Sequence, residues 1–128
     1  MTSPSDCPCG SGRPLVECCG PTLAGTSLPP DAEALMRSRY SAYVLRDEAY
    51  LLATWHPDTR PASLGLDQEP ATKWLGLAVK RHEDAGDGRA MVEFVARYKI
   101  GGRAHRLHET SRFLLEHGRW WYLDGNCP

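Results

Sequence analysis

The sequence predicts an α+β protein in which a curved antiparallel sheet of four strands wraps around N-terminal helices, behind a small cysteine-rich knuckle. Three observations carry this prediction. Apolar residues recur at helical spacing between residues 31 and 55, and the period changes to two after residue 72. Short turn signals divide the second part into four strands. Four of the five cysteines fall within residues 7–19.

Composition describes an ordinary folded domain. The 128 residues suit one domain plus a short appendage, and we divide them into a knuckle (1–22), a linker (23–30) and a main domain (31–128). With 41% hydrophobic and 24% charged residues, the chain does not have the composition of a disordered protein. Its net charge of −1 gives no general attraction to nucleic acid, and no apolar run is long enough to span a bilayer. We therefore predict neither nucleic-acid binding nor a membrane span.

The cysteine-rich segment has the spacing of a metal site. Cys7 and Cys9 form one close pair, Cys18 and Cys19 form the other, and a glycine-containing loop can fold one pair onto the other. Four thiolates select zinc or iron over hard cations. A closed tetrahedral set suits structural zinc best, and iron is the alternative metal.

Two disulfides or four unligated thiols are the other interpretations of this segment. Disulfides require an oxidising compartment, whereas residues 1–6 lack the basic and apolar regions of a signal peptide. We therefore expect a reducing, cytoplasmic location. Cys127 is left over as a free thiol.

The first helix of the main domain is predicted over residues 31–45. Asp31 follows two prolines and can serve as its N-cap. The apolar stripe of this helix consists of Leu35, Met36, Tyr40, Ala42, Tyr43, Val44 and Leu45. We expect Arg37, Arg39 and Arg46 to lie mainly off this stripe.

A second helix and four strands complete the domain. Asp47 can cap a helix over residues 48–55, and prolines and glycines then interrupt residues 57–72. The strands are predicted over residues 73–83, 89–100, 103–116 and 119–123. We expect Leu75, Leu77 and Val79 on one face of the first strand. Because only the helices can cover one face of this sheet, the sheet should curve around the first helix.

The third predicted strand carries polar residues on its apolar face. Its odd positions from 107 onward read Leu107, Glu109, Ser111, Phe113 and Leu115. Successive side chains alternate between faces, so Glu109 and Ser111 should point inward. Glu109 is then either a pocket carboxylate, for acid–base chemistry or for holding a polar ligand, or one half of a structural pair with Arg37, Arg39 or a helix-end amide. We favour the structural pair.

His56 follows Trp55 at the end of the second predicted helix. It is either an imidazole at the pocket mouth that exchanges a proton with Glu109, or a helix C-terminal residue that interacts with the helix dipole. We favour the second interpretation. The predicted ligand pocket consists of Tyr40, Trp55, His56, Glu109, Ser111 and Phe113, with Glu109 and His56 as the candidate catalytic residues.

The cysteine-rich segment resembles the SEC-C motif, a short zinc-binding module best known at the C-terminus of the SecA preprotein translocase. That motif reads Cys-x-Cys-Gly-Ser-Gly, a basic stretch, and Cys-Cys or Cys-His. The matching residues are Cys7, Cys9, Gly10, Ser11, Gly12, Cys18 and Cys19. The resemblance implies that these four cysteines bind the metal. Residues 13–17 contain one basic and one acidic residue, so the segment lacks the family's lysine-rich middle.

The rest of the chain resembles the YchJ family, in which a SEC-C motif precedes a domain of the nuclear-transport-factor-two-like superfamily. The residues that carry the resemblance are 35–43, 50–57, 92–98, 108–113 and 118–125. It implies a cone-shaped α+β fold with a pocket between sheet and helices. It implies no activity, because this superfamily contains both enzymes and binding modules.

Three functions follow from these observations. The first is a non-enzymatic binding or adaptor protein, in which the knuckle contacts a protein partner and the pocket holds a small ligand or partner. The second is a small lyase, isomerase or hydrolase that uses Glu109 and His56. The third is zinc or iron handling through the thiolates. We rank them in that order, because no known catalytic motif is present and four thiolates leave a metal no open position.

Overall fold

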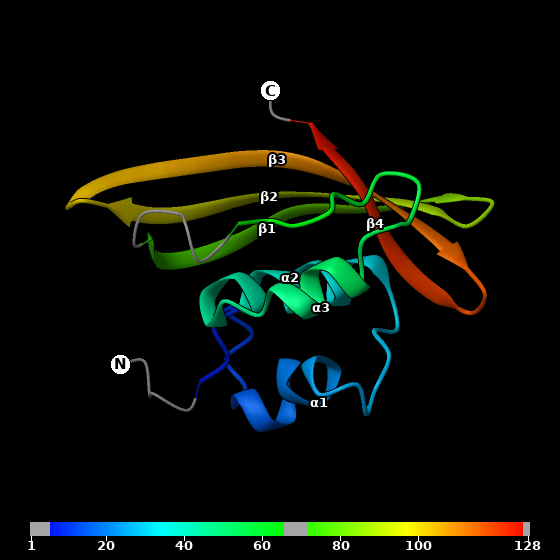
Figure 1. Ribbon diagram of the computed structural model, residues 1–128, viewed down its shortest axis with the longest axis horizontal. Coiled ribbons are helices and arrows are strands. Elements are labelled where there is room, and N and C mark those ends of the chain that lie inside the picture. Colours follow the sequence, from blue (N-terminus) through cyan, green and yellow to red (C-terminus); the bar gives the residue numbers. More distant parts are fainter. Residues whose placement is uncertain (1–5, 66–71, 127–128) are drawn as a thin grey trace.

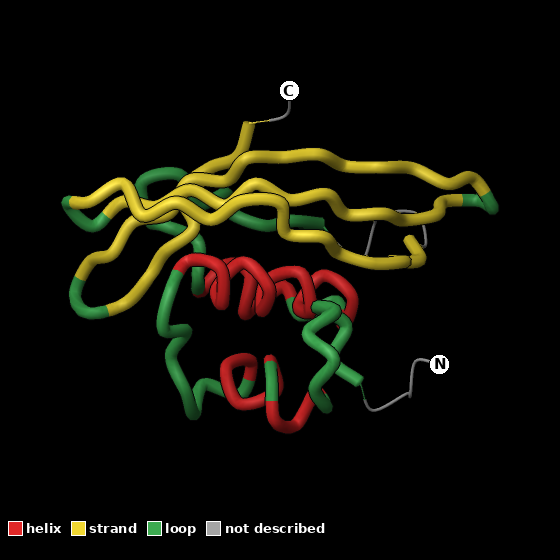
Figure 2. Tube along the Cα trace, turned by 180° about the vertical axis from the view of Figure 1, so that it is seen from behind, coloured by secondary structure: helices red, strands yellow, loops and turns green. Residues whose placement is uncertain are grey.

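The computed structural model describes residues 6–65 and 72–126. The chain forms three tiers (Figure 1): the sheet, a middle tier of helices α2 and α3, and the knuckle with α1 on the side of α2 away from the sheet. The knuckle contains the 3-10 helix η1 (Leu15–Glu17) and α1 (Cys19–Leu23). The tube in Figure 2 shows the same three tiers from behind. The predicted α+β class with a curved four-stranded sheet is confirmed.

The two middle helices begin where their capping residues predict. In α2 (Ala32–Leu45), the Asp31 carboxylate accepts a hydrogen bond from the Ala34 amide at 2.7 Å. In α3 (Glu48–Ala53), the Asp47 carboxylate accepts one from the Tyr50 amide at 3.1 Å. A side chain that accepts from a free first-turn amide stabilises the start of a helix. Helix α3 ends two residues earlier than predicted.

The strands are β1 (Thr72–Gly86), β2 (Arg89–Ile100), β3 (Arg103–Glu116) and β4 (Arg119–Asn126), paired antiparallel in the order β1-β2-β3-β4. The bounds of β2 and β3 are as predicted, and β1 and β4 extend beyond their predicted ends. The tight turns fix these bounds, since positive-φ residues such as Asp87 and Gly88 connect β1 to β2.

A β-bulge changes the inward face of β1. Trp74 pairs with Tyr98, whereas Gly76 pairs with the preceding residue of β2, so Leu75 is an extra residue in its strand. The expectation that Leu75 shares a face with Leu77 and Val79 is therefore wrong, and Leu75 is 42% exposed. Trp74 faces the helices in its place, and Leu77 is again packed against the core.

One apolar cluster joins all three tiers. Leu35 from α2, Val92 from β2 and Phe113 from β3 are at most 1% exposed within it. Cys7 and Cys9 of the knuckle belong to the same cluster. The knuckle is thus packed onto the domain through α2. No helix in the described ranges is long and apolar enough to cross a membrane.

Candidate metal centre and ligand cavity

The four motif cysteines converge on one point. Their Sγ atoms all lie within 4.8 Å of one another. The Cys9 and Cys18 Sγ atoms are 3.6 Å apart, and those of Cys18 and Cys19 are 4.0 Å apart. A tetrahedral zinc with Zn–S bonds of about 2.3 Å separates its sulfurs by about 3.8 Å, so the donor set fits that ion. The structure has all four thiols free, in an arrangement that fits a shared metal ion.

Local backbone geometry produces this convergence. The Cys7 amide donates to the Arg13 carbonyl at 2.9 Å and closes the loop that carries the first cysteine pair. Gly10 and Gly12 adopt φ values of 80° and 82°, which glycine reaches without steric cost. The short helices η1 and α1 then bring the second pair beneath the first. A Cβ at Gly20 would lie 2.6 Å from a backbone oxygen of η1, so this close approach requires glycine.

Helix α2 supplies contacts behind the thiols. Arg37 Nη1 donates to the Cys9 carbonyl at 2.9 Å, and the Ser41 hydroxyl lies 3.5 Å from Cys7 Sγ. Within the knuckle, the Ser11 hydroxyl lies 3.1 Å from Cys18 Sγ. Such contacts orient ligands and stabilise thiolate charge. Arg37 places a positive charge beside a site that a metal would leave with net negative charge.

The pKa values of Cys9, Cys18 and Cys19 are shifted in different directions by their shared site. A hydrogen bond from Cys19 holds the pKa of Cys9 well below its ordinary value, although burial opposes this shift. The same hydrogen bond and burial raise the pKa of Cys19. Burial raises the pKa of Cys18. Metal binding at this cluster would therefore release protons.

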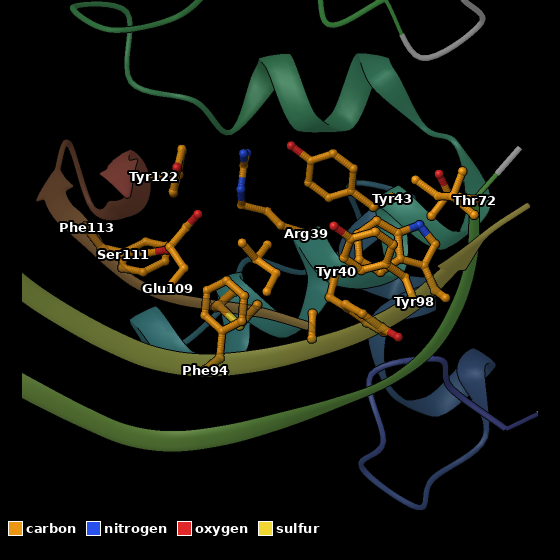
Figure 3. A pocket seen from close by; sticks show the side chains of 15 residues that line it. Arg39, Tyr40, Tyr43, Thr72, Phe94, Tyr98, Glu109, Ser111, Phe113 and Tyr122 are labelled. Carbon is orange, nitrogen blue, oxygen red and sulfur yellow. The ribbon is translucent and has the colours of Figure 1, made fainter. Parts of the chain in front are cut away.

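A cavity of about 480 Å³ lies between α2 and the sheet (Figure 3). Seven of its lining residues are aromatic, and among the described residues only Arg39 and Glu109 bring a charge to it. The lining consists of Met36, Arg39, Tyr40, Tyr43, Thr72, Trp74, Phe94, Ala96, Tyr98, Ile100, Leu107, Glu109, Ser111, Phe113 and Tyr122. A volume of this size suits a small organic ligand.

The Arg39 side chain extends from α2 toward α3, and the residue is 5% exposed. Its Nη1 donates to the Leu51 carbonyl at 2.8 Å and to the Thr54 hydroxyl at 2.7 Å. Its Cζ lies 4.2 Å from the centre of the Tyr122 ring. Burial lowers the pKa of Arg39, and neighbouring tyrosines and Glu109 counter part of that shift. The guanidinium group thus ties α2 to α3 and β4.

Glu109 is partly buried at the β3–β4 side of the cavity. Its Oε2 accepts a hydrogen bond from the Ser111 hydroxyl at 2.6 Å. A Cβ at Gly125 of β4 would lie 2.2 Å from that oxygen, so glycine at this position makes room for the carboxylate. The negative charge of Glu109 also contributes, after burial, to the raised pKa of Tyr122. The described residues form no ion pair with Glu109, and the Arg37 alternative fails because Arg37 bonds Cys9 and Glu33.

Comparison with known proteins gives the chain a family. The family model for the middle NTF2-like domain of YchJ matches residues 31–125. The chain belongs to the YchJ family. A UPF0225 protein of Ralstonia nicotianae is 58% identical over 130 residues, covering 94% of this chain and 90% of that protein. A UPF0225 protein of Cupriavidus metallidurans is 55% identical and covers 98% and 91%.

Two solved structures support the same assignment. The solution structure of a SEC-C motif containing protein from Rhodopseudomonas palustris has a TM-score of 0.80 and 36% identity, covering 95% of this chain and 98% of that one. The crystal structure of a SEC-C motif containing protein from Psychrobacter arcticus has a TM-score of 0.76 and 27% identity, covering 95% and 82%. The YchJ domain of this chain is therefore accompanied by a SEC-C knuckle whose four thiols form a metal-type cluster.

The structure brings together four of the six residues predicted for the pocket of this YchJ domain. Tyr40, Glu109, Ser111 and Phe113 line the cavity. Trp55 and His56 are not among the lining residues, because their segment runs beside β4 and forms a bridge to it at Trp55. Cys127 lies outside the described residues.

His56 is held apart from Glu109. Its amide donates to the Tyr122 carbonyl at 2.7 Å, and its ring Nε2 lies 2.9 Å from a carboxylate oxygen of Glu116. Its Nδ1 accepts from the Asp58 amide at 3.1 Å. Both ring nitrogens are thus engaged away from the cavity. The predicted proton exchange between His56 and Glu109 has no geometric basis here.

Arg39 and Trp74 are cavity residues that we did not predict. The expectation that Arg39 lies mainly off the buried stripe is wrong. Met36, Arg39, Tyr40 and Tyr43 recur at spacings of three and four residues, which place them on one helix face. That spacing was the available signal for Arg39. Trp74 carried no such signal, because the neighbouring bulge changes which side chains of β1 face inward.

Proposed function

We propose that the chain is a zinc-stabilised, non-enzymatic binding protein. The observation that carries this proposal is the convergence of four Sγ atoms within 4.8 Å of one another. Four thiolates complete a tetrahedral coordination sphere, so the metal has a structural role and offers no position to a substrate. The metal holds the knuckle against α2, and the domain behind it holds a ligand in the cavity.

The composition of the cavity favours binding over catalysis. Within the described lining there is one carboxylate and no histidine or cysteine. General acid–base catalysis of the kind considered above needs a second group within hydrogen-bond reach, and His56 is engaged with Glu116 instead. The aromatic lining supplies apolar contact area for a small ligand.

The exposed surface of the knuckle can serve a protein partner. Val16 of η1 is 78% exposed, and an apolar side chain on a rigid, metal-held loop is a suitable contact residue. The free thiols require a reducing compartment, so we place the protein in the cytoplasm.

Metal analysis tests the proposal. We expect elemental analysis of freshly purified protein to give one zinc per chain and little iron. The variant Cys7→Ser/Cys9→Ser should lose the metal, while nuclear magnetic resonance shows β2 and β3 still paired. Cys127→Ser is the matched control and should keep it. Zinc retention by the double variant would refute the assignment of Cys7 and Cys9 as metal ligands. Iron with thiolate charge-transfer absorbance, or rapid loss of zinc to a weak chelator, would refute the structural-zinc role in favour of metal handling.

A further inference from the structure

The cavity has two chemically different ends, and this division bears on what it can hold. In Figure 3, Glu109 and Ser111 lie at one end, Tyr40 and Tyr98 lie at the other, and Phe94 lies between them. All five line the same cavity. A molecule that fills its length therefore meets a carboxylate at one end and aromatic rings at the other.

Glu109 has no ion-pair partner among the described residues, and Arg39 acts on it only through a longer-range charge interaction. Ser111 donates to its Oε2 at 2.6 Å, and the ion pairs among the described residues do not include Glu109. A partly buried carboxylate with one neutral donor remains poorly compensated, because burial removes water from its charged form. A cationic group that enters the cavity would therefore gain a strong electrostatic contact.

Arg39, the other charged residue of the lining, already uses part of its guanidinium group within the protein. Its Nη1 already donates to the Leu51 carbonyl and the Thr54 hydroxyl, at 2.8 and 2.7 Å. The Tyr122 ring covers its guanidinium group, with 4.2 Å between Cζ and the ring centre. These contacts direct the cation toward α3 and β4. Glu109 is therefore the charged cavity residue that keeps acceptor positions for a ligand, since Ser111 occupies only part of its capacity.

The other end suits a flat apolar body. The Trp74 ring lies 5.6 Å from the Tyr40 ring in an edge arrangement and 5.3 Å from the Tyr98 ring in a tilted one. Rings in this arrangement present faces and edges on which an aromatic group can stack. Their faces also attract positive charge, which further disfavours an anion.

We propose that the cavity binds a small organic cation, a protonated amine on an aromatic or similarly flat apolar body, with its ammonium group on Glu109. This inference rests on the proposed ligand-binding role of the cavity and adds the chemical class of the ligand. Gly125 leaves room for the Glu109 carboxylate, since a Cβ there would lie 2.2 Å from Glu109 Oε2. It positions the carboxylate without contacting the ligand.

Three probes of similar shape and different charge test the proposal. The metal-loaded protein is titrated at neutral pH with 2-phenylethylamine, 2-phenylethanol and 3-phenylpropanoate, while amide resonances of the cavity strands and zinc content are followed together. An alkyl amine is protonated at this pH. We expect the amine to bind about 10- to 100-fold more tightly than the alcohol, the range set by one hydrogen bond to a charged group. The carboxylate should bind most weakly.

Matched variants locate the charge that the amine recognises. Glu109→Gln keeps the shape of the side chain and should remove the preference for amine over alcohol. Glu93→Gln is its control, because Glu93 precedes the cavity residue Phe94 on β2 and so lies on the opposite face of the sheet. Gly125→Ala keeps the charge but displaces it, and should also weaken amine binding. Retained alcohol binding by each variant shows that the cavity is still folded.

The possible results separate this inference from the proposed function. Equal binding of amine and alcohol, or tightest binding of the carboxylate, would overturn the cation assignment and leave a ligand-binding cavity. The assignment also falls if Glu109→Gln keeps the amine preference. If none of the probes shifts cavity resonances at millimolar concentration, the assignment and the binding role of the cavity both fail. The zinc content of the same samples would still decide the metal site.

Discussion

The knuckle and the cavity lie on opposite sides of α2 and differ in how they use polar groups. In the knuckle, four sulfur atoms from a short stretch of chain face one another, and Arg37 and Ser41 of α2 support them. In the cavity, Glu109 is part of the lining, and its hydrogen-bond donor among the described residues is Ser111. A bound metal would satisfy all four thiolates of the knuckle, whereas Glu109 keeps acceptor positions for a ligand.

The contrast indicates which region gives the protein its specificity for a ligand. A closed thiolate site stabilises structure and has no free coordination position. An aromatic cavity with a partly buried carboxylate in its lining can distinguish molecules by charge and shape. Because α2 contributes Arg37 and Ser41 to one region and Arg39 and Tyr40 to the other, both regions depend on the same helix.

Removal of the metal should cause the largest loss of stability, and this loss should be confined to the knuckle. Structural zinc binding is worth about 10–16 kcal/mol in zinc-finger peptides, so the knuckle should lose its order when a strong chelator takes the metal. We expect amides of residues 7–23 to lose protection in hydrogen-exchange mass spectrometry, while those of β2 and β3 keep theirs. The Cys7→Ser/Cys9→Ser variant is the control, and chelator should not change it further. Loss of protection throughout the sheet would show that the two regions fold as one unit.

A cavity-creating substitution in the core should destabilise the domain and leave metal binding unchanged. We expect its effect on stability to be smaller than that of metal removal. Leu35→Ala removes a side chain that is 1% exposed in the shared core, and should lower the free energy of unfolding by about 2–5 kcal/mol. Denaturant unfolding measures this loss, and zinc content of the folded protein should not change. Leu45→Ala is the matched control, since Leu45 is 50% exposed and should cost about 0.5 kcal/mol or less. If Leu35→Ala also releases the metal, the knuckle depends on the core more than on its own ligands.

The knuckle and the cavity also differ in how far the sequence could predict their residues. The knuckle was predictable because its four ligands lie in one short segment with a distinctive spacing. Glu109 and Ser111 were predictable because β3 pairs in register with β2 along the cavity, so alternation holds there. Trp74 was not, because a bulge at the next residue shifts the alternation. Nor was the placement of His56, which depends on a bridge between Trp55 and Tyr122 that joins distant parts of the chain.

An exposed ion pair on the sheet should have the smallest effect and a definite pH dependence. Arg112 Nε donates to Asp124 Oδ1 at 2.6 Å, and Nη2 donates to the other carboxylate oxygen. This contact holds the pKa of Asp124 below its ordinary value. The unfolded chain therefore binds more protons than the folded one in acid, and stability from the pair is lost as the pH falls through the folded pKa.

Asp124→Asn should therefore lower the melting temperature slightly near neutral pH, with the difference from wild type disappearing in acid. The effect is small because water screens an exposed pair. Thermal unfolding of both proteins at a series of pH values measures it, and the same substitution in an Arg112→Gln background should add no pH-dependent loss. A difference that persists at a pH well below the folded pKa of Asp124, where the carboxyl is protonated in both states, would assign the effect to strand packing. The contact between Arg112 and Asp124 would then stabilise the sheet through side-chain packing, whereas the contacts around the thiolates depend on charge.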